Sequence, residues 1–320
     1  EDALHLLRRL FCAKTAESGQ GKGGMGRADF LSRAGAIAAG IPFLSFGYGI
    51  ARGRFDFRVV KQQISFPSLP RGFDGLRIVH ISDLHLGSFF NAKKEVLPAV
   101  RMVNELHPDL LLFTGDMVNN LAEETEGWED IIGSMEAKMG KYAVLGNHDY
   151  GDYAAWPSAA ARRENQDRLI QSIGKMGFRL LLDEWVELER SGDSLVIAGV
   201  ENWGSGRFPR YGNLQKATSG IPAGSFTVLL SHDPSHWDAQ VLVNTNIQLT
   251  LSGHTHGFQF GIETPYFRWS PAQYRYPRWG GLYREGKQYL YVNRGLGYIG
   301  FPGRVGMPPE ITCISLSSSA

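Results

Sequence analysis

Five short apolar runs, each followed at once by a turn that carries aspartate, asparagine or histidine, constrain this fold more than any other sequence feature. The clearest run is residues 77–81, whose apolar and β-branched side chains predict a strand that ends just before Asp83 and His85. In open α/β sheets, binding sites form in the crevice at the carboxyl ends of the strands. The repeated pattern therefore predicts an α/β fold whose strand ends gather polar side chains.

The other four apolar runs end in the same way. They deliver Asp116 after 110–114, Asn147 and His148 after 142–145, His232 after 226–231, and His254 and His256 after 247–251. A hydrogen-bonded core histidine would explain any one of these histidines, but it does not explain the whole set. The remaining histidines have no such neighbours and are expected to be structural: His5, His80, His107 and His236.

The donor atoms of this set suit a metal site. Carboxylates, imidazoles and one amide without thiolate favour Mn, Fe or Zn. The set is too large for one ion, so we expect two divalent ions, roughly 3.5–4 Å apart, that share a bridging carboxylate. The charge of two divalent ions, +4, exceeds the −3 of two carboxylates and a hydroxide. The remaining positive charge favours an anionic phosphate ester, although neutral substrates stay possible.

Further elements complete an α/β pattern. Gly115, Gly146 and Gly253 precede the polar residues and are expected to allow tight strand-to-loop turns. The apolar spacing predicts helices at 92–106, 122–138 and 162–176 and more strands at 59–66, 178–182, 195–200, 288–293 and 311–316.

The charge and cysteine content exclude some classes of protein. With 33 basic and 32 acidic residues among 320, the chain has no general positive field, so no nucleic acid is expected as a partner. Cys12 and Cys313 are far apart in sequence, which implies no disulfide framework and no cysteine-based zinc site.

The N-terminal region predicts a membrane anchor. Residues 1–27 form a basic, glycine-rich segment that is expected to be a flexible linker, and residues 28–54 contain an uncharged stretch, Ala34–Ala51. As a helix this stretch would extend about 27 Å, nearly the thickness of a bilayer core. A cleaved export signal and a buried core helix are the alternatives. The remainder of the chain, residues 55–320, is expected to form one domain, and Glu1 in place of Met suggests a fragment or a processed form.

The flanking charges do not decide on which side of a membrane the rest of the chain would lie. Basic residues stand on both sides of the uncharged stretch, so the positive-inside rule is close to neutral. Arg27 precedes Phe30 and Leu31 as in a twin-arginine export signal, but Ala28 stands where the second arginine should be.

The motifs Asp83-x-His85, Gly115-Asp116, Gly146-Asn147-His148-Asp149, His232 and Gly253-His254-Thr255-His256, in this order, resemble the calcineurin-like metallophosphoesterase family. Within it the chain is similar to bacterial membrane-anchored or exported phosphohydrolases, whose relatives include UDP-2,3-diacylglucosamine hydrolases. The resemblance implies a two-sheet αββα sandwich preceded by the membrane helix, in a bacterial cell membrane with the domain on its outer side.

The resemblance also implies a role for each residue of the motifs. Asp83, His85 and His256 would hold the first metal, Asp116 would bridge, and Asn147, His232 and His254 would hold the second. His148 would stabilise the transition state or protonate the leaving oxygen, and a hydroxide between the metals would be the nucleophile.

One departure from the family pattern separates this chain from the protein-phosphatase branch. Asn119 stands where that branch carries the carboxylate that orients the histidine, and its arginine is missing as well. The chain is therefore not expected to be a Ser/Thr protein phosphatase, and the group that orients His148 stays unassigned.

Arginines and aromatic residues alternate over residues 264–284, directly after His256. Such a segment could bind the phosphate of a small-molecule or lipid ester or lie against lipid headgroups, and it could equally be a covering loop. The candidate phosphate contacts are Arg268, Arg275, Arg278, Arg294 and Arg304. The expected function is a dimetal hydrolase of phosphate mono-, di- or pyrophosphate esters. The alternatives are a non-catalytic metal- or lipid-binding module and a nuclease.

Overall fold

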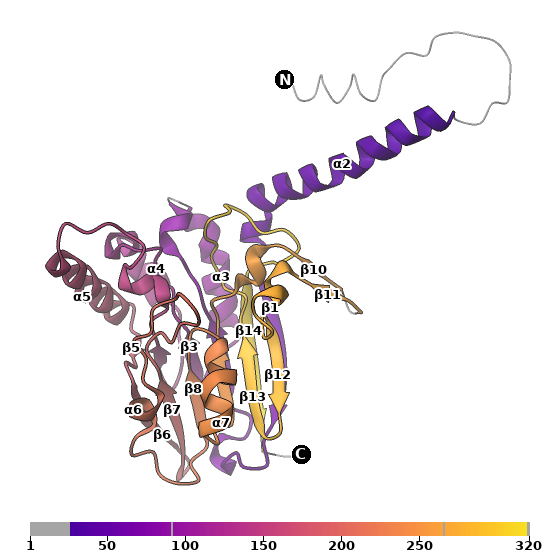
Figure 1. Ribbon diagram of the computed structural model, residues 1–320. Helices are drawn as coiled ribbons and strands as arrows, with labels where there is room; N and C mark the ends of the chain where they lie inside the picture. The colour runs from indigo at the N-terminus through magenta and orange to yellow at the C-terminus, as the bar shows by residue number, and fades with distance from the viewer. Residues whose placement is uncertain (1–25, 91, 265, 319–320) are drawn as a thin grey trace. The chain divides into compact units, whose positions relative to one another are not determined.

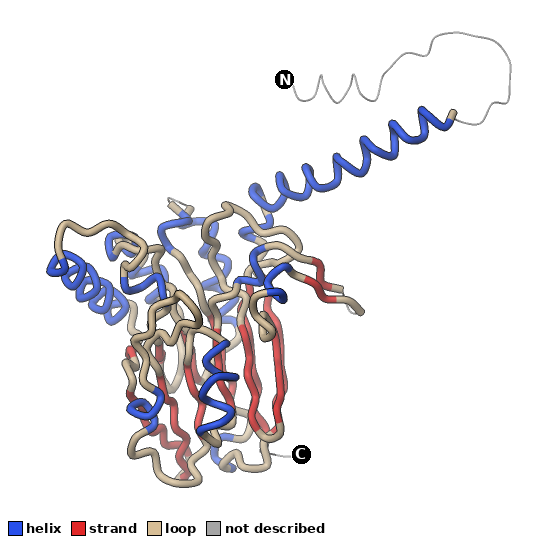
Figure 2. The backbone as a smooth tube through the Cα atoms, in the orientation of Figure 1, coloured by secondary structure: helices blue, strands red, loops and turns tan. Residues whose placement is uncertain are grey.

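Two six-stranded β-sheets form the centre of the fold (Figures 1 and 2). The computed structural model describes residues 26–90, 92–264 and 266–318. The chain divides into two units, Glu1–Leu44 and Ser45–Ala320, and both sheets belong to the second unit. The predicted linker 1–27 lies almost wholly outside the described residues, and His5 lies outside them too.

The first sheet has the strand order β1-β14-β2-β3-β4-β5. Strands β2 to β5 are parallel to one another, while β14 pairs antiparallel to β2 and parallel to β1. Because β2, β3 and β4 are parallel neighbours, their carboxyl ends meet at one edge of the sheet. The strands are β1 (Arg58–Ser65), β2 (Arg77–Ile81), β3 (Leu110–Phe113), β4 (Lys141–Ala143), β5 (Arg179–Leu180) and β14 (Glu310–Ser317).

The second sheet has the order β12-β13-β9-β8-β7-β6, with β13, β9, β8 and β7 parallel and an antiparallel strand at each edge. Its strands are β6 (Glu184–Arg190), β7 (Asp193–Gly199), β8 (Thr227–Leu230), β9 (Leu249–Ser252), β12 (Gly281–Glu285) and β13 (Gln288–Val292). A separate two-stranded hairpin joins β10 (Ile262–Glu263) to β11 (Arg268–Trp269).

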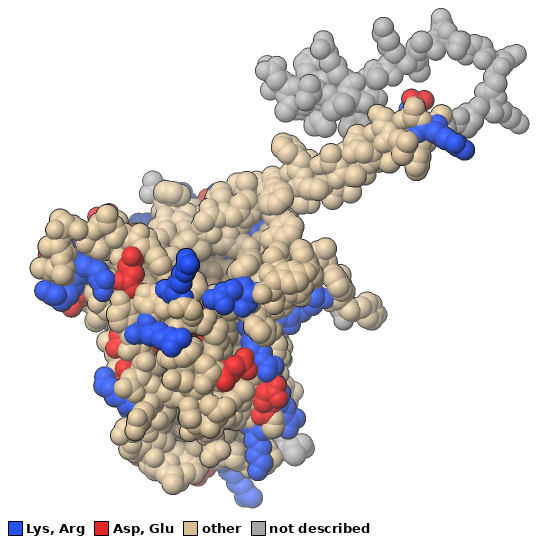
Figure 3. Space-filling model, in the orientation of Figure 1, with Lys and Arg blue, Asp and Glu red and all other residues tan. Residues whose placement is uncertain are grey.

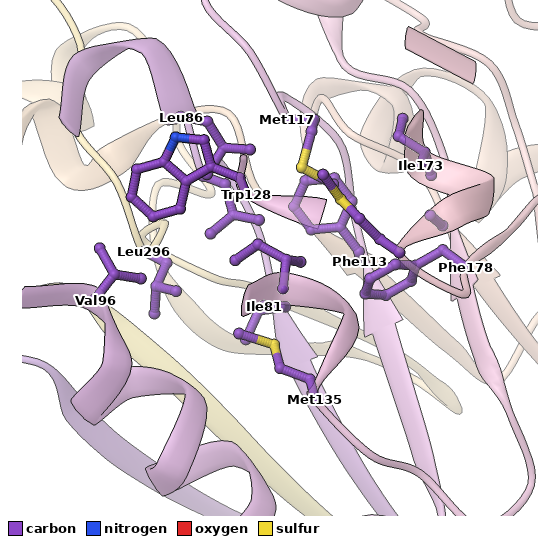
Figure 4. Close-up of a cluster of buried hydrophobic side chains, with 14 of the residues drawn as sticks. Ile81, Leu86, Val96, Phe113, Met117, Trp128, Met135, Ile173, Phe178 and Leu296 are labelled. Carbon is purple, nitrogen blue, oxygen red and sulfur yellow. The ribbon is translucent and has the colours of Figure 1, made fainter. Parts of the chain in front are cut away.

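Three buried clusters hold the layers together. Apolar side chains of both sheets, such as Leu112 and Val228, pack between the sheets. The opposite face of the first sheet packs on helices α3 (Lys93–Glu105), α4 (Glu129–Gly133) and α5 (Ala159–Lys175), and Figure 4 shows Ile81, Phe113 and Ile173 there. The outer face of the second sheet packs on α6 (Leu214–Thr218) and the segment Trp237–Asn244, which contains α7 (Leu242–Asn244). The predicted αββα sandwich is confirmed.

The predicted strands all form, with ends within two residues of those expected, but one helix prediction is wrong. Residues 122–138 contain a 3₁₀ turn (Ala122–Thr125) and the five-residue α4 instead of one helix. Gly127 lies between them with a φ of +70°, a left-handed conformation that interrupts a helix. Strands β6, β10, β11 and β12 were not predicted.

Helix α2 (Arg27–Ala51) contains the uncharged stretch predicted as the anchor. It has 25 residues and, by length and composition, could cross a membrane, a test that signal sequences also pass. The boundary between the two units falls within this helix, after Leu44, so its last turns belong to the unit that contains the sheets.

Candidate metal centre

The seven predicted ligands all lie in loops at the carboxyl ends of five parallel strands. Asp83 and His85 follow β2, Asp116 follows β3 and Asn147 follows β4 in the first sheet, while the second sheet contributes the loops after β8 and β9. Two groups of side chains could each hold an ion, because their ligand atoms lie within 4.8 Å of one another. The groups are Asp83, His85 and His256, and Asp116, His232 and His254.

The carboxylate of Asp116 lies between the two groups. Its Oδ2 atom is 3.2 Å from Nε2 of His232 in the second group and 3.6 Å from Nε2 of His85 in the first. In the first group, His85 Nε2 is also 3.2 Å from His256 Nε2, which is 3.4 Å from Asp83 Oδ1. One carboxylate thus faces both sets of donors, as a bridging ligand would.

Hydrogen bonds behind the imidazoles turn their free nitrogens toward the centre. Nδ1 of His232 donates to the carbonyl of Thr114 at 2.6 Å, which leaves Nε2 to face Asp116 and Asn147 Oδ1. His254 is reversed: its Nε2 pairs with the Tyr276 hydroxyl at 2.9 Å, and its Nδ1 points to His232. Such partners fix the tautomer and orientation of metal-binding histidines, so this donor set fits divalent ions.

Burial keeps three of these imidazoles neutral, which is the form that binds a metal. It lowers the pKa of His85 to about 3 and that of His254 to about 4, and it holds the pKa of His256 well below the usual value. Desolvation of the charged ring is the largest cause in each case.

His232 and Asp116 form the opposite kind of pair. Burial alone would lower the pKa of His232, but the charges of Asp116 and Asp83 and the hydrogen bonds to Asp116 and Thr114 together outweigh burial and raise that pKa to about 10. Burial would raise the pKa of Asp116, yet His232 and His148 hold it well below its usual range. A divalent ion at this position would replace the shared proton, so metal affinity should rise with pH.

The backbone at the ligands is strained. Asp83, His85, Asp116, His254 and His256 all have φ between +46° and +71°, the left-handed region that non-glycine residues rarely adopt. Each such residue costs about 1–3 kcal/mol and persists only where the surrounding structure fixes it. The strain is concentrated on five of the seven predicted ligands.

Two of the three glycines are needed because a neighbouring loop lies too close to leave room for a side chain, and their backbone is not in the left-handed conformation. A Cβ atom on Gly253 would lie 1.9 Å from Ser82 Oγ and 2.3 Å from Asp83 Oδ2, and one on Gly146 would lie 2.2 Å from Asp116 Oδ1. Gly115 alone of the three has a positive φ, +95°. The turn explanation is therefore confirmed for Gly115 only, because at the other two positions a ligand carboxylate fills the space of a side chain.

Asp149 organises the ligand loops, a role that the sequence did not assign. Its buried carboxylate accepts hydrogen bonds from four backbone N–H groups, those of Asp116, Met117, Val118 and Gly146, at 2.8–3.2 Å. These bonds join the loop after β3 to the loop after β4. The position of Asp149 directly after His148 was the sequence feature that could have indicated this role.

A backbone carbonyl supplies the missing orienting group of His148. Nδ1 of His148 lies 2.7 Å from the carbonyl oxygen of Asn119, which can only accept, so Nδ1 carries the hydrogen. The ring packs edge-on to His85, with centroids 5.0 Å apart. Tyr153, whose ring is 4.7 Å from that of His148, accepts a hydrogen bond from Asn147 Nδ2.

Two of the five candidate arginines are buried and occupied by protein partners. Arg294 forms ion pairs with Glu310 and Glu263. Arg304 donates to the backbone carbonyls of Arg294 and Gly297, and its guanidinium lies 3.2 Å from Nδ1 of His256, on the side of the ring away from the centre. Both guanidinium groups are thus held by protein partners, and their contact with a phosphate stays a prediction.

The three remaining candidates lie nearer the surface. Arg278 pairs with Asp238 and Glu285, and Arg268 pairs with Glu263 and stacks over Trp279. Arg275 is exposed and stacks on Tyr276, the residue that positions His254. Figure 3 shows acidic and basic side chains interspersed on the visible face, in keeping with the net charge of +1.

The sequence of this chain is similar to those of known proteins. Residues 76–258 match the family described as calcineurin-like phosphoesterase. The metallophosphoesterase YkuE of Bacillus subtilis is 31% identical over 308 residues, covering 92% of this chain and 99% of that protein. A transmembrane protein with metallophosphoesterase domain from Danio rerio is 30% identical and matches 85% of this chain and 60% of its own length.

A third relative has a named substrate. The UDP-2,3-diacylglucosamine pyrophosphatase LpxG of Chlamydia trachomatis is 29% identical over 304 residues, covering 79% of this chain and 87% of that protein. The family match spans more than half of the chain and includes the loops that carry Asp83, Asp116, His232 and His256. This chain belongs to the calcineurin-like phosphoesterase family and is a hydrolase, a metallophosphoesterase.

Proposed function

We propose that this chain is a membrane-anchored, two-metal hydrolase of a phosphodiester or pyrophosphate bond in a lipid or cell-envelope metabolite. The position of the Asp116 carboxylate, within 3.6 Å of imidazoles from both ligand groups, carries the proposal, because a shared ligand is what two adjacent ions require. Bound there, two divalent ions would neutralise phosphate charge and supply a hydroxide at neutral pH.

The residues of the chain hold and orient the reacting groups. Asp149 fixes the loops that present Asp116 and Asn147, and the Asn119 carbonyl keeps the hydrogen of His148 on Nδ1. Nε2 of His148 is then the atom that, when protonated, gives its proton to the leaving oxygen as the P–O bond breaks. Arg275 is the candidate arginine best placed to contact a phosphate, since it stacks on Tyr276 beside the centre.

The substrate class rests on two observations. Helix α2 could anchor the chain in a membrane, and the anchored chain would meet phosphate esters at the lipid surface. The chlamydial relative is named for cleaving the pyrophosphate of a nucleotide-linked diacyl sugar. A pyrophosphate that joins a nucleoside to a lipid is therefore the first substrate to test.

The test compares Asp116→Asn with Asp167→Asn, an exposed aspartate on α5. Full-length protein is stripped with a chelator, reloaded with Mn, Fe or Zn, and assayed on a nucleoside-diphosphate lipid, an aryl phosphodiester, an aryl phosphomonoester and DNA. We expect metal-dependent turnover that Asp116→Asn abolishes and Asp167→Asn preserves. Metal binding without turnover of any ester would support a non-catalytic module, and salt-sensitive DNA cleavage would support a nuclease.

A further inference from the structure

Several exposed apolar side chains lie in the segment that directly follows the metal ligand His256, outside helix α2. Tyr266 is 98% exposed, and Phe267 and Ile262 are more than half exposed. These three residues belong to the β10–β11 hairpin, which projects from the sheets in Figure 1, or to its turn. Together with the exposed Phe258 we call them the apolar edge. An exposed cluster of this kind marks an interaction surface.

The base of the hairpin packs on the last turns of helix α2. The ring of Phe46 stacks on Phe260 at 5.7 Å and meets Phe301 edge-on at 5.5 Å. Phe260 in turn packs edge-on to Trp269 of β11 at 6.2 Å. A chain of aromatic contacts therefore connects the end of the predicted anchor to the hairpin.

A backbone contact fixes the same helix end beside the metal centre. The N–H of Arg304 donates to the carbonyl of Gly49 at 3.1 Å, and a Cβ atom on Gly49 would lie 2.8 Å from the Arg304 carbonyl. The guanidinium of Arg304 lies beside His256. One residue thus touches both the helix and the metal ligand.

These contacts limit how far the hairpin can be from a bilayer that α2 crosses. The apolar stretch ends at Ala51, and Arg52 and Arg54 follow at the place where basic side chains meet headgroups. Phe46 is six residues before Arg52, about 9 Å along the helix axis, and so lies inside the apolar boundary. Phe260, stacked on Phe46, shares that depth, and β10 begins two residues later.

We propose that the apolar edge is a second membrane contact, which inserts into the interfacial layer of the bilayer and holds the metal centre at the lipid surface. This inference rests on the membrane anchoring in the proposed function. Tyrosine favours this layer and phenylalanine is buried in it, and Tyr266 and Phe267 of the apolar edge supply these side chains. The substrate is then a phosphate ester presented by the bilayer, with its acyl chains left in the lipid.

A spin label tests the contact without reference to catalysis. Full-length protein with Cys12→Ser and Cys313→Ala receives Phe267→Cys or, as a matched control, Val243→Cys, an apolar residue on α7 that is 71% exposed. The labelled proteins are reconstituted in vesicles of phosphatidylethanolamine and phosphatidylglycerol, and accessibility to oxygen and to a water-soluble nickel chelate is measured.

We expect the label at 267 to be about five-fold less accessible to the nickel chelate than the label at 243, with raised oxygen accessibility, since interfacial groups lie about 5–10 Å into the headgroup boundary. Equal accessibility at the two positions would overturn the proposal. So would spin–spin broadening at 267 without a rise in oxygen accessibility, because that result would assign the apolar edge to a second copy of the chain.

An activity measurement separates this inference from the proposed function. The double variant Tyr266→Ser/Phe267→Ser should lower turnover of a nucleoside-diphosphate lipid in vesicles by about tenfold and leave turnover of a soluble aryl phosphodiester within about twofold, as expected when only interfacial contact is lost. Equal losses on both substrates would overturn the membrane contact. If the unaltered protein hydrolyses neither ester, the proposed function fails, while the spin-label result still decides the contact.

Discussion

His85 and His236 are both buried and both neutral, yet their surroundings differ. Burial lowers the pKa of each, to about 3 for His85 and about 4 for His236. In His236 both ring nitrogens meet ordinary partners, Ser231 Oγ at 2.8 Å and Gln240 Oε1 at 3.0 Å. In His85, Nε2 instead faces another imidazole and a carboxylate. What distinguishes a ligand here is the direction of its free nitrogen; burial and pKa are alike in both.

The largest expected difference between the two histidines is in catalysis. His85→Ala should lower kcat/KM by about 10⁴-fold, since it removes a ligand of the first metal and with it charge stabilisation of the reacting phosphate. Metal content measured by mass spectrometry should fall in parallel. A variant that keeps both its metal content and its activity would show that His85 is a structural histidine like His236.

His148 should separate catalysis from metal binding. His148→Gln is expected to lower kcat by about 10²–10³-fold, the usual contribution of a positioned general acid. Its metal content should stay unchanged, because its Nδ1 is occupied by the Asn119 carbonyl and the ring lies outside both ligand groups. Loss of metal in this variant would place His148 among the ligands.

Replacing His236 should lower stability and leave activity nearly unchanged, whereas replacing His85 should abolish most of the activity. His236→Ala removes a buried ring that stacks on Trp203 and leaves the hydroxyl of Ser231 unpaired, so the free energy of unfolding should fall by about 2–4 kcal/mol. The activity of the folded variant should stay within about threefold of the unaltered protein, since no metal ligand is lost. Chemical denaturation and kcat/KM per folded molecule measure the two quantities.

The smallest expected effect is the change in the free energy of unfolding with pH that His236 causes. Burial lowers the pKa of His236 to about 4 in the folded protein, below the value of 6.5 for a free histidine, so the unfolded chain binds more protons between these values. The stabilisation is therefore complete above pH 6.5 and is lost as the pH falls toward 4. At pH 5 the loss should be about 1–2 kcal/mol.

His236→Gln provides the comparison for this pH effect, because it keeps a polar side chain but does not titrate. The difference between the unfolding free energies of the two proteins at pH 7 and pH 5 isolates this histidine, and the other titrating groups cancel. A difference that does not change with pH would mean that His236 is already free to take up a proton in the folded protein.

Two of the four strands that were not predicted share one feature. β6 and β12 are the edge strands of the second sheet, and both carry charged residues, such as Glu184 and Arg190 in β6 and Arg284 in β12. Interior parallel strands such as β3 and β8 are buried on both faces and appear in sequence as uninterrupted apolar runs. Edge strands lack that signal, so the pattern that located the interior strands did not extend to them.

The candidate arginines show the same limit at the level of side chains. Interleaved arginine and aromatic residues indicated phosphate or lipid contact, but the charge on Arg294 is neutralised by Glu310 and Glu263, which are far from it in sequence. Composition cannot distinguish an arginine free to bind a ligand from one paired within the protein, because the difference lies in neighbours that only folding supplies.

The sequence by itself determined which residues stand at strand ends, because an apolar run specifies a buried strand and the polar residues after it must lie at its edge. It also identified the family through the order of those residues. Only the tertiary structure decided that the loops of the two sheets meet at one site and which ring nitrogen of each histidine is free. It also decided that Asn119 orients His148 through its backbone carbonyl. These features depend on contacts between distant residues, such as His85 with His256 and His232 with Thr114, and local sequence carries no record of them.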